Sequence, residues 1–203
     1  FGGTRIEYQM SSGGPGSGLF KSTDSGTTWS PALNIGITSH LIYSVGSSVA
    51  NSSAVVGGFQ DNGTRVRSGS TTIYDQRIGG DGFGSNIHRT NASLMLGSLY
   101  YAQVRKSTNG GTTWASSCSG ITECGNNATA PFNTGIVAWD GSATGDQVYT
   151  WSNTKVYRST NYGGSWTALG VTGLPTTSFF VRGVGVAFSN ANTMALIANG
   201  GRV

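Results

Sequence analysis

The stretch Ser107-Thr-Asn-Gly-Gly-Thr-Thr-Trp114 occurs three times in this chain with small changes. It returns as Ser22-Thr-Asp-Ser-Gly-Thr-Thr-Trp29 and as Ser159-Thr-Asn-Tyr-Gly-Gly-Ser-Trp166. Each copy reads Ser-Thr-[Asp/Asn], a glycine turn, then a hydroxyl residue and Trp. Such self-similarity is the first guide to architecture, because a repeated unit restricts the fold before any local prediction is made.

The chemistry of each repeat predicts a tight turn between two strands. Asp and Asn side chains accept hydrogen bonds from nearby backbone N–H groups, and the following Gly adopts a positive φ at little steric cost. The Trp begins a new strand and supplies a large ring for packing. Short strand-like runs that end in a cation precede the repeats at Gly18–Lys21, Gln103–Lys106 and Lys155–Arg158.

The repeats resemble the Asp-box, or BNR, repeat of β-propellers, which is found in sialidases, sortilin-type receptors and xyloglucan-cleaving glycoside hydrolases. The resemblance implies an all-β propeller of four-stranded antiparallel blades. It also implies that the box turns are structural and lie at the blade periphery, away from the functional face. The positions that match the box are Ser22, Asp24, Gly26, Trp29, Ser107, Asn109, Gly111, Trp114, Ser159, Asn161, Gly163 and Trp166.

The full repeat unit is longer than the box and has the length of a propeller blade. Four short strands between turn signals are predicted for one blade, at Ile136–Trp139, Gln147–Trp151, Lys155–Arg158 and Ser165–Ala168. A second blade is predicted around residues 86–117, with central strands at Ser93–Gly97 and Tyr100–Arg105.

A third blade without a box is predicted between the first two boxes. Its strands are Leu41–Val45, Ser53–Gln60 and Thr64–Arg67. Asp61-Asn-Gly63 is the hairpin turn, because Asn-Gly between strands is the strongest short hairpin signal.

The two ends of the sequence predict incomplete blades. Thr4–Tyr8 and Gly18–Ser22 lead into the first box, and Val184–Phe188 and Met194–Ala198 begin a last unit. We therefore expect about three whole and two partial blades in a single propeller segment over residues 1–203. A longer chain or other copies of this one would complete the ring, and exposed strand edges favour such self-association.

Composition indicates a turn-dense β-protein from an extracellular setting. Gly accounts for 33 of the 203 residues, whereas charged residues make up only 10%. The net charge of +4 reflects scarce acids and not basic clusters, which argues against a nucleic-acid partner. No run approaches the roughly 18 apolar residues that a membrane span needs. Phe1 in place of an initiator Met predicts a processed product or a fragment.

Cysteines and sequons point to secretion or the cell surface. Cys118 and Cys124 enclose five residues and are predicted to form a small disulfide loop, with two free thiols as the alternative. Two Cys without a nearby His make a poor zinc site. Four Asn-x-Ser/Thr sequons predict glycosylation at Asn51, Asn62, Asn91 and Asn127.

No cofactor is predicted. Asp24 and Asp61 are oxygen ligands near glycine turns, which leaves calcium open. Hard cations need six or more oxygens, however, and the sequence contains no dense Asp cluster.

Two segments beyond the boxes are candidates for chemistry. Gly57–Thr64 contains Gln-Asp-Asn-Gly, and Gly79–Phe83 reads Gly-Gly-Asp-Gly-Phe, a combination similar to sortilin-like and xyloglucanase-like propeller proteins. Asp61 and Asp81 would then form the carboxylate pair of a glycoside hydrolase, roughly 5–9.5 Å apart. The structural alternative is that Asp61 caps the Asn-Gly turn and that Asp81 sits in a Gly-rich turn. The resemblance further implies that catalysis takes two facing propellers, for which this chain is too short.

Aromatic residues are the candidates for ligand binding. Trp139, Trp151 and Tyr101 lie outside the boxes and are predicted to stack on sugar rings, with core packing as the alternative for the two Trp. The three box Trp residues are expected to be buried.

Three functional hypotheses follow. The first is a secreted or cell-surface scaffold that binds glycans or proteins. The second is a xyloglucanase-like hydrolase that uses Asp61 and Asp81. The third is an extracellular filament or surface-layer subunit joined by edge strands.

Overall fold

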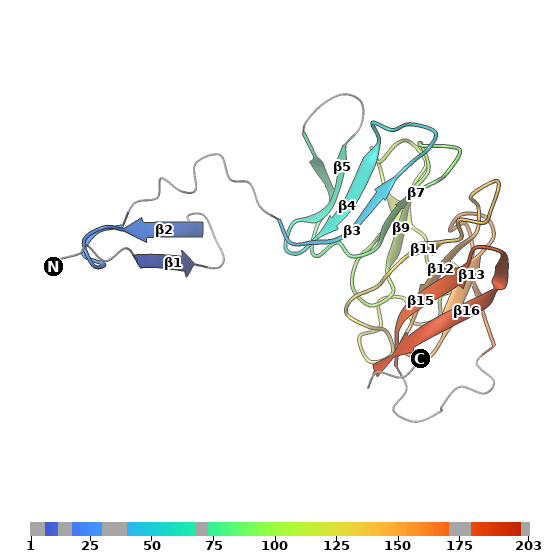
Figure 1. Ribbon diagram of the computed structural model, residues 1–203. Coiled ribbons are helices and arrows are strands. Elements are labelled where there is room, and N and C mark those ends of the chain that lie inside the picture. The colour runs from blue at the N-terminus through green and yellow to red at the C-terminus, as the bar shows by residue number, and fades with distance from the viewer. Residues whose placement is uncertain (1–6, 12–17, 30–39, 68–72, 171–179, 200–203) are drawn as a thin grey trace. The chain divides into compact units, whose positions relative to one another are not determined.

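The computed structural model describes residues 7–11, 18–29, 40–67, 73–170 and 180–199 (Figure 1). Contacts divide the chain into two units, Phe1–His40 and Leu41–Val203. In the described residues all sixteen elements are β-strands, which confirms the predicted all-β class. Within these ranges no helix has the length and apolar character of a membrane span. The prediction of a single segment over residues 1–203 stays a prediction.

The second unit contains three four-stranded antiparallel sheets and a final strand pair, which follow one another along the chain (Figure 1). The first sheet contains β3 (Ile42–Ser47), β4 (Val55–Phe59), β5 (Gly63–Arg67) and β6 (Asp75–Ile78). The second contains β7 (Ser85–Ile87), β8 (Met95–Ser98), β9 (Val104–Ser107) and β10 (Ala115–Ser116). The third contains β11 (Val137–Ala138), β12 (Val148–Trp151), β13 (Val156–Ser159) and β14 (Thr167–Ala168). The final pair is β15 (Val181–Ala187) and β16 (Asn190–Ala198).

Three whole sheets and a partial one at the C-terminal end are therefore as predicted. In the first unit, β1 (Glu7–Ser11) pairs with β2 (Gly18–Ser22) just before the first repeat. In the second and third sheets the repeat joins the third strand to the fourth. By this equivalence β2 corresponds to the third strand of a sheet and β1 to its second.

Several strand predictions were wrong in their boundaries, and a clear case lies in the second sheet. The run Tyr100–Arg105 was predicted as a strand, but β9 begins only at Val104. Tyr101 and Ala102 have φ values of 61° and 57°, so both residues belong to the turn that reverses the chain after β8. The apolar character of this run reflects the buried Ala102 and Val104.

Apolar residues fill the space between successive sheets, and this packing gives the molecule its core. Ala54, Val56 and Val66 of the first sheet pack against Ile87 and Met95 of the second. A larger cluster joins the second sheet to the third and contains Leu96, Ala102, Val104, Ile121, Ala130, Val148, Tyr157, Tyr162 and Trp166. The last cluster joins the third sheet to β15 through Tyr149, Trp151, Val156, Val181 and Val184.

The three sequence repeats adopt the same hydrogen-bonded turn. In the third, the Ser159 hydroxyl donates to Asn161 Oδ1 (2.8 Å) and accepts the Gly163 N–H (2.8 Å). Asn161 Oδ1 also accepts the Ser165 N–H (2.9 Å). Ser22 with Asp24, and Ser107 with Asn109, make the equivalent bonds in the other two turns. The turn is therefore built by side chains within five residues of one another.

Burial of the repeat Trp side chains differs from expectation. Trp166 is 4% exposed and lies in the cluster between the second and third sheets. Trp114 is half-buried, and Trp29 is 37% exposed. The expectation that all three are buried is therefore confirmed only for Trp166, whose ring packs between the second and third sheets.

The first repeat is expected to keep its turn to low pH. The Thr28 hydroxyl and N–H and the Ser22 hydroxyl donate to the Asp24 carboxylate, and these bonds lower the pKa of Asp24 from 3.8 to about 2. Because the folded-state pKa is depressed, the bonds contribute to stability above pH 3.8 and are lost as pH falls through about 2. In an NMR titration, the Thr28 amide shift should move near pH 2.

Two internal controls accompany this titration. Asn109 and Asn161 hold the same place in the other repeats and do not ionise, so the Thr113 and Ser165 amide shifts should stay constant. The variant Asp24→Asn should abolish the Thr28 titration and keep the turn. A Thr28 midpoint near pH 4 would show that these bonds do not form in solution.

Candidate functional site

Antiparallel topology separates the loops of the second unit into two groups at opposite ends of the sheets. The hairpins that join second to third strands, and the links from one sheet to the next, share one end, called here the connection end. This end includes residues 60–63, 79–84, 99–103 and 117–136. The repeats join third to fourth strands, so they lie at the other end, called here the repeat end.

The predicted carboxylates Asp61 and Asp81 are brought together at the connection end. The Asp61 N–H donates to Asp81 Oδ1 at 2.6 Å, and Asp81 also forms a parallel bridge with Gly63. Asp61 is exposed with a φ of 56°, whereas Asp81 is half-buried. One Asp81 oxygen therefore caps the hairpin turn of the first sheet, while the Asp61 carboxyl group lies at the surface.

Glycines in the two loops serve a close contact between backbones. Gly63 has a φ of 65°, and a Cβ built on it would lie 1.9 Å from the Ile78 carbonyl oxygen. A Cβ on Gly82 would lie 2.4 Å from the Gly63 carbonyl oxygen. Only Gly fits at such distances, so packing accounts for Gly63 and Gly82.

Five aromatic side chains gather beside these loops, and they are called here the aromatic surface. They are Tyr43 at the start of β3, Phe83 before β7, Tyr100 and Tyr101 after β8, and Phe132 before β11. Phe83 is 1% exposed and forms the base, with ring centroids 4.7 Å from Tyr43 and 5.3 Å from Phe132. Phe132 also stacks on Tyr100 at 5.6 Å and meets Tyr101 edge-on at 5.7 Å.

The aromatic surface is accessible and adjoins the Asp81 loop. Phe132 is 52% exposed and Tyr43 39%, while Tyr100 and Tyr101 are half-buried. The Tyr100 hydroxyl lies beside Gly80, 3.3 Å from the position of a Cβ built there. Sequence reasoning selected Tyr101 but missed Tyr43, Phe83 and Phe132. The sequence signal that could have identified them is that each successive sheet has an aromatic residue close to a loop of the connection end.

The two predicted sugar-stacking Trp residues lie in different surroundings. Trp151 is 6% exposed in the core between the third sheet and β15, and its indole N–H has no partner among the described residues. Its ring faces are therefore closed to a ligand. Trp139 is half-buried at the repeat end, where its indole N–H donates to the Ala187 carbonyl (3.0 Å). It lines a pocket of about 120 Å³ together with Arg89 and Asp140.

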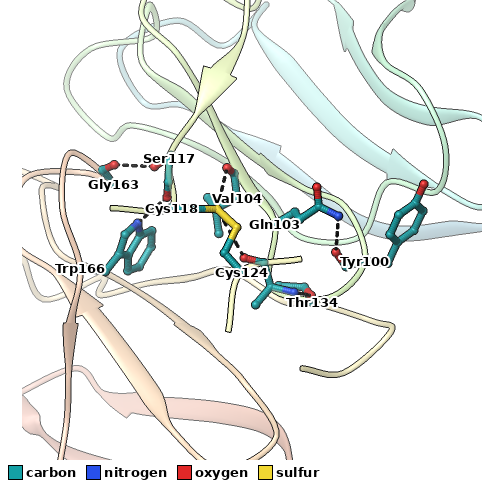
Figure 2. Close-up of a disulfide and its surroundings, with 10 residues drawn as sticks. Tyr100, Gln103, Val104, Ser117, Cys118, Cys124, Thr134, Gly163 and Trp166 are labelled. Carbon is teal, nitrogen blue, oxygen red and sulfur yellow. Dashed lines mark hydrogen bonds between the residues drawn. A yellow bond between two sulfur atoms is a disulfide. The ribbon is translucent and has the colours of Figure 1, made fainter. Parts of the chain in front are cut away.

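The predicted disulfide between Cys118 and Cys124 is confirmed, and Figure 2 shows it between the second and third sheets. The sequons are placed unequally. Asn51, Asn91 and Asn127 are exposed, whereas Asn62 is half-buried and its amide donates to the Gln60 carbonyl (3.0 Å). Glycosylation at all four stays a prediction.

Metal-ligating side chains do not gather in the part of the chain that the structure describes. No group of three or more His, Cys, Asp or Glu residues there could hold an ion. Asp24, named above as an oxygen ligand, uses its carboxylate within its own turn. Calcium binding therefore gains no support from the described residues.

Comparisons with known proteins identify the fold. No protein-family model matches the chain, and no curated protein is significantly similar to it. An ancestral GH74 enzyme is similar in structure, with a TM-score of 0.62 and 21% identity over 89% of this chain and 24% of that one. The GH74 xyloglucanase from Xanthomonas campestris has a TM-score of 0.53 and 14% identity over 82% of this chain and 29% of that one.

These similarities, with the antiparallel four-stranded sheets, show that the fold is a β-propeller segment whose sheets are blades. The chain spans about a quarter of the length of the two enzymes.

Proposed function

We propose that this chain is part of a secreted or cell-surface propeller scaffold that binds glycan chains through the aromatic surface. The main evidence is the group of aromatic rings around Phe132. These rings come from three successive blades, and the group is exposed to solvent at the connection end of the sheets. Exposed apolar patches rimmed by polar residues mark binding sites. Tyr rings combine an apolar face with a hydroxyl, which suits the alternating CH and OH groups of a sugar.

The same proposal assigns the three repeats to the Asp-box class, as turns that hold the outer strands in place. Their shared pattern of Ser, Asx and Gly hydrogen bonds supports this assignment. The Cys118–Cys124 disulfide supports an oxidising compartment. A protein partner is the second ligand class, and the test below separates it from a glycan.

The alternative function is glycoside hydrolysis by Asp61 and Asp81. The observation in its favour is that the two loops converge, with 2.6 Å between the Asp61 nitrogen and Asp81 Oδ1, next to the aromatic surface. Two carboxyl groups flanking a sugar bond can act as acid and as base or nucleophile. The bond from Asp61 to Asp81 equally supports a turn cap, which is why binding is the preferred proposal.

We expect the variant Phe132→Ala to weaken polysaccharide binding about 10-fold, because it removes the most exposed ring of the aromatic surface. Affinity electrophoresis in gels containing xyloglucan, mixed-linkage β-glucan, mannan or galactan measures this effect. Phe188→Ala is the matched control, since Phe188 is 72% exposed and lies outside the aromatic surface.

Each outcome of this experiment decides between the hypotheses. If a polysaccharide retards the wild type and retards Phe132→Ala equally, the aromatic surface is not the binding site. Absence of retention on every polysaccharide would favour a protein partner. Release of reducing sugar by the wild type, abolished in Asp81→Asn, would establish the hydrolase instead.

A further inference from the structure

A groove of about 280 Å³ lies at the repeat end, between the second and third repeats. One side is formed by Lys106 of β9 and by Thr108, Thr113 and Trp114 of the second repeat. Gly164 of the third repeat lies on the other side. The groove therefore joins two neighbouring blades, and it is separate from the aromatic surface at the connection end.

Lys106 supplies a positive charge to this groove. No carboxylate of the described residues lies within ion-pair distance of its amine, which is 3.4 Å from the Asn161 carbonyl oxygen and 5.7 Å from the centroid of the Tyr162 ring. Burial lowers the pKa of Lys106, and the charge of Asp146 opposes this effect only in part. An anion that binds in the groove stabilises the charged form of this partly desolvated ammonium group.

The remaining walls offer hydroxyl groups and an apolar ring. The Thr113 hydroxyl accepts the Asn109 amide (2.9 Å) and keeps its own proton to donate. Thr108 is exposed at the rim. Trp114 is half-buried, and its indole N–H is used by the Gly111 carbonyl (2.9 Å), so it contributes apolar surface and no donor.

We propose that this groove binds a uronic acid residue of an acidic polysaccharide, with the sugar carboxylate on the Lys106 amine. The sugar hydroxyls then meet the two Thr hydroxyls, and one face of the sugar ring lies against Trp114. An acidic peptide offers the same carboxylate but lacks the ring hydroxyls that the two Thr residues match. The proposal does not depend on the aromatic surface, because the two sites lie at opposite ends of the blades.

The test measures binding of trigalacturonate to the full chain by isothermal titration calorimetry. We expect Lys106→Gln to weaken binding about 10-fold or more, and Lys106→Arg to retain most of it. Arg158→Gln is the matched control. Arg158 precedes the third repeat as Lys106 precedes the second, and it contacts Asn192 (3.3 Å) outside the groove, so its loss should change affinity less than 2-fold.

NMR amide chemical shifts of the wild-type protein test the site independently, because this measurement does not require that any variant folds correctly. Trigalacturonate should shift Thr113 and Gly164, and neutral cellotriose should not. If Lys106→Gln and Arg158→Gln lose the same affinity for trigalacturonate, binding rests on general charge attraction, and the proposal is overturned. Equal affinity for triglutamate would overturn the sugar assignment, and shifts confined to the aromatic surface would overturn the site.

Discussion

The variant Tyr162→Ala should lose about 3–5 kcal/mol of unfolding free energy, the range for removal of a large buried aromatic side chain. Tyr162 belongs to the third repeat but is 1% exposed, because its ring enters the space between the second and third blades. The ring meets His88 edge-on, with centroids 4.7 Å apart. Urea unfolding followed by Trp fluorescence measures the loss.

The Tyr162 hydroxyl adds a polar contact across the same boundary. It donates to Asn86 Oδ1 at 2.8 Å, and burial raises the pKa of this phenol well above its ordinary value, so it remains a donor. Tyr162→Phe should therefore cost about 1 kcal/mol, the typical net value of a hydrogen bond. A loss in Tyr162→Phe as large as that in Tyr162→Ala would place the stabilising contact in the hydroxyl and not in the ring.

Backbone conformation provides a sharper control at this position. Tyr162 has a φ of 50°, and the equivalent Ser25 and Gly110 have φ values of 56° and 66°. Left-handed backbone costs non-glycine residues about 1–2 kcal/mol. We therefore expect Tyr162→Gly to be more stable than Tyr162→Ala by about 1 kcal/mol, the reverse of the order found in helices. A less stable Tyr162→Gly would contradict the described turn.

Loss of the disulfide in Cys118→Ser/Cys124→Ser should cost about 2 kcal/mol, the loop-closure value for a short loop. The two Cys are six positions apart. Their loop is part of the link between β10 of the second blade and β11 of the third. The loop carries the buried Ile121, and its Ser119 carbonyl accepts the Trp166 N–H at 2.8 Å. Freeing the loop therefore weakens the contact between the two blades.

Side-chain contacts of Glu123 also hold this loop against the third blade, independently of the disulfide. Glu123 is 8% exposed and accepts hydrogen bonds from Lys155 (2.6 Å) and from Tyr157. Burial opposes the charged form of Glu123, but the bonds from Lys155 and Tyr157 outweigh it and lower the pKa of Glu123. The loop should thus remain docked after reduction, and the protein should remain folded.

Thermal melting with and without dithiothreitol checks the disulfide prediction. The reductant should lower the midpoint of the wild type to that of Cys118→Ser/Cys124→Ser and leave the double variant unchanged. An unchanged wild-type midpoint under full reduction, verified by mass after alkylation, would show that the disulfide does not stabilise the fold.

Local chemistry made the blades and their turns predictable. The repeat turn depends on side chains within five residues, such as Ser159 with Gly163, and the short disulfide loop is also local. Short strand-like runs and an Asn-Gly turn are also local signals in the sequence, so the strand order of each antiparallel blade followed directly from them. The boundary of β9 was missed because the left-handed conformation of Tyr101 and Ala102 has no marker in residue type.

The candidate sites could be predicted only in part. Asp61 and Asp81 were selected from their turns, but residue types could not show that Asp81 accepts the Asp61 N–H. Trp139 and Trp151 have similar sequence surroundings, yet Trp139 borders a pocket and Trp151 is 6% exposed in the core. Burial of a ring depends on the next blade, which the local sequence does not encode.

The sequence by itself determined the all-β blade architecture, the three repeat turns and the disulfide, because these features depend on contacts between residues close in the chain. The tertiary structure alone decided which aromatic rings form the exposed surface around Phe132. It also decided that Tyr162 locks two blades together and that Lys106 faces a groove between repeats. Each of these three features joins residues of different blades, and their approach follows from how the blades pack side by side.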